Sequence, residues 1–174
     1  MVTFLEPDKI VEQIKIKDDF HVADFGAGTG GFTLSLADKM RQGLIYACDI
    51  QEEPLSALVG QAKTLGHHNI KTIKCDLEEP NGSTLPHESM DLVVIANTLF
   101  QSDQKARILR EAMRVIKQDG QIIVIDWKPD SAFGPEGERI SFEEITKIFE
   151  RTGYTLKKEL DTGTYHWGGI YAKV

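Results

Sequence analysis

The sequence predicts a doubly wound α/β fold, a mainly parallel β-sheet with helices on both faces, giving three layers. Three observations predict it. Short apolar runs alternate with amphipathic stretches along the chain, as in repeated β–α units. A glycine-rich loop, residues 26–31, directly follows the first apolar run and opens an amphipathic stretch. Residues 90–96 are almost continuously apolar, which is typical of a strand buried on both faces.

Each element can be placed from its own pattern. Apolar runs predict five strands, at residues 20–25, 44–48, 70–75, 90–96 and 121–125. Helical spacing of apolar residues predicts helices at residues 7–16, 30–40, 55–65 and 103–117. Gly66 follows one of these helices at the position where a glycine commonly ends a helix.

The pattern changes after the fifth strand. Residues 127–139 form a loop rich in glycine, proline and charge. Ser141 with Glu144 makes a capping box, which predicts a helix from there to about Arg151. Two further strands, 154–160 and 165–173, flank a short Asp-Thr-Gly turn and should form an antiparallel hairpin.

Composition bounds the class of protein. The chain has 174 residues, 41% hydrophobic and 27% charged, as expected of one soluble domain spanning residues 1–174. The net charge of −7 argues against a general nucleic-acid backbone binder. There are only two cysteines, and no apolar run approaches a membrane span. We therefore expect a cytoplasmic protein.

The glycine loop carries the strongest functional signal. It reads Asp-Phe-Gly-Ala-Gly-Thr-Gly-Gly from Asp24, and glycines there let backbone N–H groups approach a ligand closely. Asp49 ends the second strand about 20 residues on, where an acidic side chain binds a ribose hydroxyl. The spacing predicts nucleotide binding, and by itself it fits both NAD and S-adenosylmethionine.

Further residues favour S-adenosylmethionine. Asp24 lies two places before the first glycine, Asp76 ends the third strand, and the chain closes with a strand hairpin. With these features the chain resembles the class I S-adenosylmethionine-dependent methyltransferases from about Phe20 to Val174. Residues 109–121 are similar to a segment of the small ubiquinone/menaquinone-type methyltransferase domains, the domain 11 and 25 groups. The resemblance implies a Rossmann-like seven-stranded sheet of order 3-2-1-4-5-7-6, with strand 7 antiparallel.

The resemblance also implies a cofactor site. The methionine end of S-adenosylmethionine would lie against the loop, the ribose against Asp49 and the adenine beside Ile50, and the segment after the fourth strand would close the pocket. The expected cofactor-binding residues are Asp24, Gly26, Ala27, Gly28, Thr29, Gly30, Asp49, Ile50, Asp76, Leu77, Asn97, Thr98 and Leu99. Nearby carboxylates suit the cationic sulfonium of the donor.

Candidate catalytic residues lie nearer the C-terminus. His166 can serve as a general base, because the pKa of histidine lies near neutrality, and Asp126 is the second candidate. A structural, hydrogen-bonded role for His166 remains the alternative. Candidate acceptor-binding residues are Trp127, Lys128, Arg139 and Trp167, and for Arg139 a loop salt bridge is an equal alternative.

The acceptor is expected to be a small molecule with a nucleophilic O, N or C atom. The Asn/Asp-Pro-Pro-Tyr/Phe segment of the family's base-amine methyltransferases is absent after the fourth strand, so a nucleic-acid acceptor is disfavoured. Residues 97 and 126–127 also depart from the metal-dependent catechol type, so no metal is expected. The alternatives are an NAD-binding oxidoreductase and a non-catalytic partner subunit that binds S-adenosylmethionine.

Little chain is left over for recognising the acceptor. Residues 1–17 should provide an N-terminal helix that acts as a partial lid, and the choice of acceptor should rest on that helix and on the loop at 127–140. If both are too small to cover the pocket, we expect a second subunit, as in a homodimer, or the substrate itself to complete it.

Overall fold

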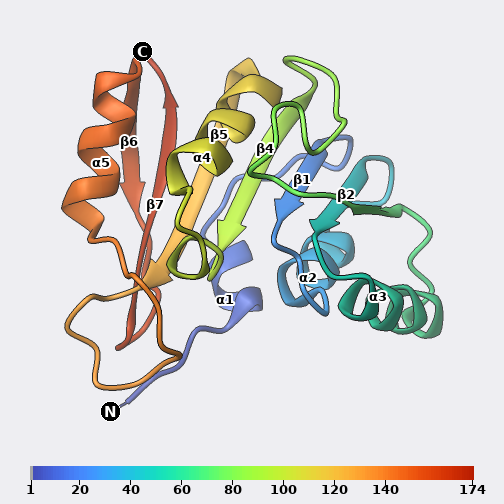
Figure 1. Cartoon of the computed structure of the whole chain (residues 1–174). Coiled ribbons are helices and arrows are strands. Elements are labelled where there is room, and N and C mark those ends of the chain that lie inside the picture. Colours follow the sequence, from blue (N-terminus) through green and yellow to red (C-terminus); the bar gives the residue numbers. More distant parts are fainter. Residues whose placement is uncertain (1) are drawn as a thin grey trace.

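A seven-stranded sheet forms the centre of the computed structural model, which describes residues 2–174. Its strand order is β3-β2-β1-β4-β5-β7-β6, and only β7 runs antiparallel to its neighbours (Figure 1). The predicted fold class and strand order are confirmed. In chain order the elements are α1 (Pro7–Val11), β1 (His21–Phe25), α2 (Gly31–Lys39), β2 (Leu44–Asp49), α3 (Glu52–Leu65), β3 (Ile70–Lys74), β4 (Met90–Ala96), the 3-10 helix η1 (Leu99–Gln101), α4 (Lys105–Val115), β5 (Ile116–Trp127), α5 (Phe142–Arg151), β6 (Tyr154–Glu159) and β7 (His166–Lys173).

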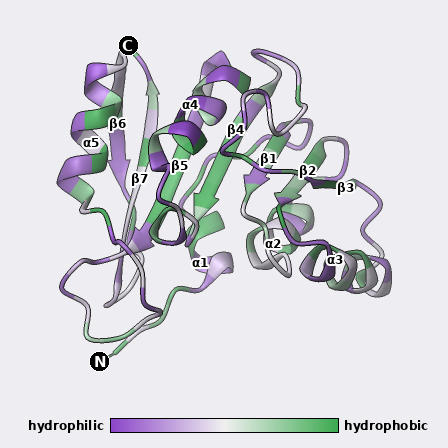
Figure 2. Cartoon of the chain, viewed as in Figure 1, coloured by the Kyte–Doolittle hydropathy of each residue, from purple (hydrophilic) through white to green (hydrophobic). Residues whose placement is uncertain are grey.

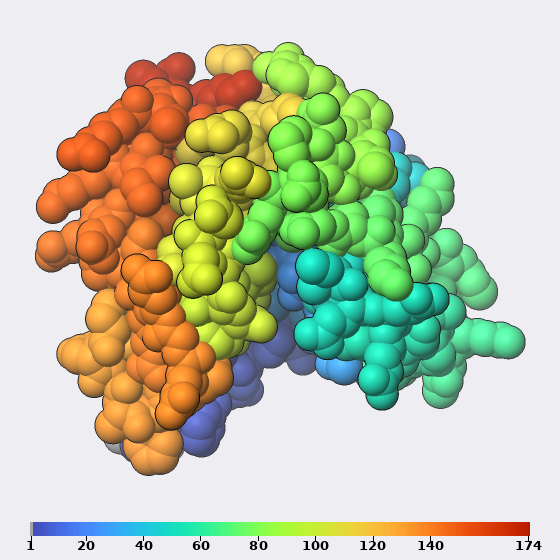
Figure 3. Space-filling view, in the orientation of Figure 1, coloured from blue at the N-terminus to red at the C-terminus, as the bar shows by residue number. Residues whose placement is uncertain are grey.

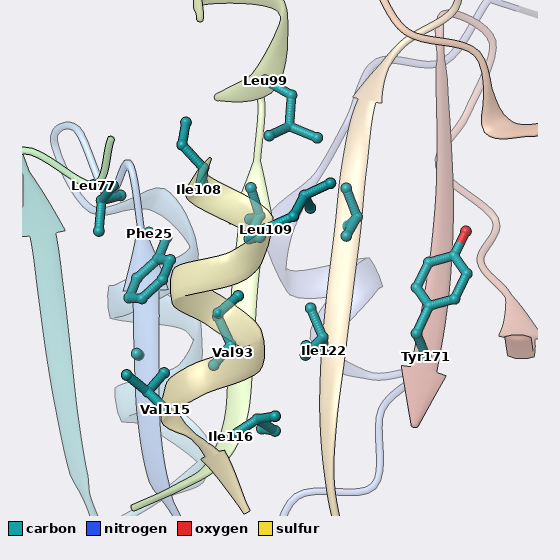
Figure 4. Close-up of a cluster of buried hydrophobic side chains, with 14 of the residues drawn as sticks. Phe25, Leu77, Val93, Leu99, Ile108, Leu109, Val115, Ile116, Ile122 and Tyr171 are labelled. Carbon is teal, nitrogen blue, oxygen red and sulfur yellow. The ribbon is translucent and has the colours of Figure 1, made fainter. Parts of the chain in front are cut away.

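Helices cover both faces of the sheet. Helices α4 and α5 pack on one face, where Leu109 and Val115 of α4 meet Val93 and Ile122 of the strands (Figure 4). Helices α1 and α2 pack on the other face, in a cluster that includes Ile45 of β2. Two residues along β2, Ala47 packs against α3, so α3 lies on that same face. The central strands β4 and β5 are mainly hydrophobic, whereas the edge strand β6 is mainly hydrophilic and the helices carry residues of both kinds (Figure 2).

The predicted end of α3, the predicted start of α5 and the predicted final hairpin are confirmed. Gly66 ends α3 in the left-handed conformation, with a φ of 78°. Ser141 begins α5 with both hydrogen bonds of the capping box in place. The final hairpin forms as expected, with β6 and β7 paired antiparallel.

Three predicted boundaries are wrong by three residues or more. Helix α3 begins at Glu52, three residues before the predicted start. The N-terminal helix ends at Val11 and does not reach Ile16. There the chain turns, because the Gln13 side chain bonds to the backbone of Asp161 and the Gln13 carbonyl accepts from Lys158. Strand β5 begins at Ile116, where α4 has just ended, since a register shift opposite β4 lets the strand pair on both sides of the irregularity.

A buried polar network ties α4 to the loop before β4. Glu111 is 5% exposed, and its carboxylate accepts from the backbone N–H and hydroxyl of Ser83 and from the Arg114 guanidinium. Arg114 also donates to the carbonyl of Leu85. Because charges this deeply buried need partners, the network fixes how the 76–89 segment lies on α4.

No helix within residues 2–174 combines the length and apolar character needed to cross a membrane.

Removing the Glu111 carboxylate should destabilise the fold strongly. We expect Glu111→Ala to lower the free energy of unfolding by about 3 kcal/mol, because the Arg114 charge and the Ser83 donors lose their buried partner. Urea denaturation measures this. The control is Glu52→Ala, which removes the exposed partner of Lys74 and should leave the midpoint unchanged. Equal midpoints for the two variants would contradict a structural role for the network.

Candidate functional site

The candidate site lies at the carboxyl ends of the parallel strands, between β1 and β4. The chain winds outward in opposite directions from these two strands, and open α/β sheets bind ligands in the crevice at such a reversal. The surface is hollowed here, between the teal α3 side and the yellow-green segment that precedes α4 (Figure 3).

Three of the four glycines in the glycine loop have different surroundings. Gly26, Gly28 and Gly30 all have positive φ values, of 79°, 53° and 91°. A Cβ added at Gly26 would lie 2.2 Å from Thr98 Oγ1, and one at Gly30 would lie 2.2 Å from Leu58 Cδ1. At Gly28 an added Cβ would meet nothing within 4 Å. Gly26 and Gly30 therefore serve internal packing, whereas Gly28 faces open space in which a ligand fits.

The larger of the two cavities at this site has a volume of about 510 Å³ and is lined by Gly28 and by two of the predicted carboxylates. Asp49 Oδ2 accepts from the backbone N–H of Gly28 at 2.8 Å, and Asp49 Oδ1 accepts from Gln51 N at 2.9 Å. Asp76 Oδ1 accepts from the backbone N–H of Glu78 at 2.9 Å. Of the predicted cofactor residues this cavity is lined by Gly26, Gly28, Asp49, Ile50, Asp76, Leu77, Asn97 and Thr98.

A second cavity of about 330 Å³ lies on the other side of Gly26. Both cavities are lined by Gly26, Ala96 and Asn97, so they meet at this point. Asp24 lines the second cavity, is 2% exposed and accepts from Thr33 Oγ1 at 2.6 Å. Burial raises the pKa of Asp24 to about 6, and the Thr33 hydrogen bonds oppose that rise.

Asn97 stands where the two cavities meet. Its φ is 53°, a left-handed conformation that asparagine tolerates better than most residues. Its backbone N–H donates to the carbonyl of Ile125 at 2.9 Å, which holds the end of β4 to β5. Its side-chain oxygen Oδ1 is buried and has no hydrogen-bond partner among residues 2–174.

His166 and Trp127 form the far wall of the second cavity. They are paired across β5 and β7, and their ring centroids lie 4.0 Å apart. His166 is 3% exposed, and neither of its ring nitrogens bonds to any residue in the described part of the chain. Burial, with the charges of Lys128 and Arg139, lowers the pKa of His166 to about 4. The imidazole is therefore neutral at physiological pH.

Asp126 points to the opposite face of the sheet from His166. Side chains alternate along β5, so Asp126 shares a face with its partner Trp167, away from Trp127 and His166. Its carboxylate accepts from the backbone N–H groups of Leu99 and Phe100, at 2.9 and 3.2 Å, and from Trp127 N at 2.7 Å. Burial raises the pKa of Asp126 to about 6. Asp126 lines neither cavity.

The other predicted acceptor residues are engaged within the protein. Arg139 donates to the carbonyls of the surrounding loop, at Lys128, Ser131, Phe133 and Pro135, and makes no loop salt bridge among the described residues. Lys128 Nζ donates to the carbonyl of Thr164, and Trp167 Nε1 to that of Ile140. Of the predicted acceptor residues, Trp127 lines the second cavity and the others line neither.

Some predicted cofactor residues lie elsewhere, and some lining residues were missed. Ala27 lines the second cavity, but Thr29, Gly30 and Leu99 line neither, and Leu99 is fully buried in the core. The second cavity is also lined by residues that were not named individually, among them Phe4, Leu5, Pro7 and Phe32. The first three lie within residues 1–17, the segment expected to act as a partial lid, and no motif marks Phe4 or Leu5. Within residues 2–174 no group of three or more His, Cys, Asp or Glu is arranged to hold a metal.

The different surroundings of Gly28 and Gly30 predict different costs for the same substitution. Gly28→Ala should lower the free energy of unfolding by about 1–2 kcal/mol, the cost of a left-handed alanine. Gly30→Ala should cost roughly 2 kcal/mol more, because its methyl group also overlaps Leu58. Urea denaturation compares the two variants. Equal losses would contradict the difference between the surroundings of Gly28 and Gly30.

The low pKa of His166 predicts a pH-dependent stability. An unfolded histidine binds a proton near pH 6.5 and the buried one only near pH 4, so stability is lost as the pH falls between these values. Relative to His166→Phe, the wild type should lose roughly 2 kcal/mol of unfolding free energy between pH 7 and pH 5. Asp24 and Asp126 titrate in both proteins, so their effects cancel. Parallel urea titrations measure the difference, and a constant gap would contradict the buried neutral imidazole.

The comparisons with known proteins agree with this geometry. The sequence model of the methyltransferase domain family matches residues 16–161. A demethylmenaquinone methyltransferase from Bacillus velezensis is 27% identical over 130 residues, which are 73% of this chain and 54% of that protein. Phosphoethanolamine N-methyltransferase 3 from Arabidopsis thaliana is 38% identical over 95 residues, 53% of this chain and 18% of that protein.

Solved structures show the same fold over nearly the whole chain. A SAM-dependent methyltransferase from Aquifex aeolicus superposes with a TM-score of 0.85 at 26% identity, covering 98% of this chain and 91% of that one. The chain spans only about half the length of the Bacillus velezensis relative, 54% of it. With its sheet order, its glycine loop and the match over residues 16–161, the chain belongs to the methyltransferase domain family.

Proposed function

We propose that this chain transfers a methyl group from S-adenosylmethionine to a small organic acceptor. The observation that carries the proposal is the pair of cavities that meet at Gly26 and Asn97. One is lined by the carboxylates that suit a nucleoside, and the other by aromatic rings and a neutral histidine. A donor and an acceptor bound in the two cavities would meet at their junction.

The residues present fit the cofactor. The open space beside Gly28 leaves room for a nucleoside to approach the protein backbone. Asp49 and Asp76 offer carboxylate oxygens for the ribose hydroxyls and the adenine amino group. Bound there, S-adenosylmethionine supplies an activated methyl group on a positively charged sulfur. Asp24 lines the second cavity together with Gly26, where the two cavities meet, and its carboxylate would favour that positive charge.

The protein's own contribution would be alignment and exclusion of water. Methyl transfer forms one bond to the methyl carbon as the bond to sulfur breaks, so holding the two partners in line supplies much of the rate enhancement. His166 can accept the proton that leaves the acceptor. Because its pKa is low, the neutral imidazole accepts hydrogen bonds but is only a weak base.

Asp126 would act as a positioning residue. Its carboxylate holds the N-terminal N–H groups of η1, and η1 follows Asn97 and Thr98 directly. Thr98 in turn donates to the carbonyl of Phe25 and packs on Gly26. Asp126 thus holds the segment that separates the two cavities without touching either ligand.

The relatives leave more than one acceptor class open. One is named for demethylmenaquinone and another for phosphoethanolamine, and this chain covers only part of each. Support for an NAD-dependent oxidoreductase comes from the glycine spacing alone. A non-catalytic subunit would bind S-adenosylmethionine and show no turnover with any acceptor.

Calorimetry with S-adenosylhomocysteine, the product of the donor, tests the proposal. The protein should bind this ligand and should not bind NAD. Asp49→Ala should weaken the binding at least tenfold, because hydrogen bonds to a charged group are worth roughly 1.5–3 kcal/mol. Asp38→Ala, which removes an exposed carboxylate of α2, should bind as the wild type does. Binding of NAD alone, or none of S-adenosylhomocysteine, would end the proposal.

A further inference from the structure

The two cysteines of the chain lie at the carboxyl ends of the neighbouring strands β2 and β3. Cys75 extends the pairing of β3, because its backbone N–H donates to the carbonyl of Asp49 at 2.9 Å. Cys48 is level with Ile73, and Cys75 lies two residues beyond Ile73, so both thiols are on one face of the sheet. They differ in access. Cys48 is fully buried in the core, whereas Cys75 is only partly buried and lines the larger cavity.

Cys75 adjoins the carboxylates proposed to bind adenosine. It directly precedes Asp76, and Cys48 directly precedes Asp49. Both carboxylates line the larger cavity together with Cys75. A group attached to the sulfur of Cys75 would therefore extend into space that a nucleoside needs.

The charged lining of the larger cavity is acidic. Asp49, Asp76 and Glu78 are its charged residues, and no lysine, arginine or histidine of residues 2–174 lines it. Lys74, next to Cys75 in the sequence, is paired with an exposed glutamate of α3. A cleft lined by charge of one sign concentrates ions of the opposite sign and speeds their association. A reagent that bears ammonium groups should therefore reach Cys75 faster than one that bears carboxylates.

The surroundings of Cys75 favour its thiolate, the form of cysteine that attacks a disulfide. A hydrogen bond from the Cys48 side chain lowers the pKa of Cys75. Burial and the carboxylates of Glu111, Asp49 and Asp76 oppose this effect without reversing it. The same hydrogen bond, together with burial, raises the pKa of Cys48. Cys75 is thus the reactive thiol, and Cys48 is a positioning residue that donates to it.

The strand register disfavours a direct disulfide between Cys48 and Cys75. Neighbouring strands lie about 4.8 Å apart and rise about 3.3 Å per residue, so an offset of two residues separates the Cα atoms by roughly 8 Å. Disulfides usually join Cα atoms about 4.4–6.8 Å apart. A disulfide partner for Cys75 must therefore come from a second molecule.

We propose that Cys75 is a site of thiol–disulfide exchange, at which a small disulfide bearing ammonium groups attaches and closes the larger cavity to the methyl donor. The Cys75 thiolate forms a bond to one sulfur of the reagent as the S–S bond of the reagent breaks. The other half leaves as a thiolate and takes up the proton that Cys75 lost, so the protein sulfur is oxidised and the released thiol is the reduced product. The effect on donor binding rests on the proposed function, whereas the exchange reaction does not.

Three disulfides of matched length test the proposal on the wild-type protein. They are cystamine, with ammonium groups, 2-hydroxyethyl disulfide, which is uncharged, and 3,3′-dithiodipropionate, with carboxylates. Mass spectrometry of the intact protein and its peptides follows attachment at pH 7.5. Each rate is divided by that of the same reagent with the urea-unfolded protein, which removes differences in intrinsic reactivity. Cystamine should react at Cys75 roughly tenfold faster than the dicarboxylate, with the uncharged reagent between them, and Cys48 should stay free.

Two variants of Cys48 test its hydrogen bond to Cys75. The rate of attachment rises with pH as the Cys75 thiol ionises. Cys48→Ala should shift this profile to higher pH, which loss of packing alone would not do, and Cys48→Ser, which keeps a donor, should restore most of it. Cys75→Ser should take up none of the reagents. If the Cys48 variants do not fold, the wild-type series decides alone.

Calorimetry with S-adenosylhomocysteine connects the reaction with the cavity. Saturating ligand should slow attachment at Cys75. The cystamine-treated wild type should lose binding of this ligand and regain it when dithiothreitol removes the attached group. Cys75→Ser should show the same affinity before and after treatment.

Any of four results would overturn the proposal: attachment at Cys48, an internal disulfide, a dicarboxylate that reacts as fast as cystamine, or unchanged binding of S-adenosylhomocysteine by fully modified protein. Failure of the proposed function is a different result, because the untreated protein would then not bind S-adenosylhomocysteine. The order of the three rates at Cys75 would still decide the exchange site in that case.

Discussion

The close approach of Gly26 and Thr98 is the constraint on which the rest of the site depends. These residues follow β1 and β4, the two strands between which the chain reverses its winding direction. Thr98 donates to the carbonyl of Phe25 at 3.0 Å, and any side chain at position 26 would overlap its hydroxyl. The contact brings the glycine loop against the segment after β4. Asp126 accepts hydrogen bonds from Leu99 and Phe100 of that segment, so a buried carboxylate that lines neither cavity holds the segment in place.

Charge is distributed unevenly across the two cavities, which would let one side bind a cationic donor and the other an acceptor. Asp24, Asp49 and Asp76 gather on the side of the glycine loop and the first strands. The opposite wall carries a neutral histidine, because burial and two nearby cations keep the proton off His166. A cationic donor would be stabilised on the first side, whereas the opposite wall would present no charged side chain to an acceptor. The buried carboxyls of Asp24 and Asp126 and the buried imidazole of His166 resist ionisation for one common reason, the loss of hydration. Burial raises the pKa of the two carboxyls and lowers that of the imidazole, so their contributions to stability change with pH in opposite directions.

Sequence reasoning reached the fold and most of the cofactor side because these depend on local patterns. Period-two and helical spacing place the strands and helices, and the glycine loop with Asp49 and Asp76 marks strand ends that must share one edge of the sheet. The acceptor side depends on contacts between distant segments. Phe4 reaches the cavity because Thr3 bonds to Thr164, and no local pattern predicts that pairing. Asp126 and His166 both appeared suitable for catalysis, and only the pairing of β5 with β7 shows that they face opposite ways. Arg139 was expected to bind a ligand or an acidic neighbour, whereas its loop closes around it through backbone carbonyls.

The central claim is that the two cavities hold donor and acceptor on either side of Gly26 and Asn97. A crystal structure with bound S-adenosylhomocysteine tests it most directly. We expect the adenosine in the larger cavity, against Asp49 and Asp76, with the sulfur at the level of Asn97 and directed toward His166. An adenosine bound outside that cavity, or a sulfur directed away from His166 and Trp127, would contradict it.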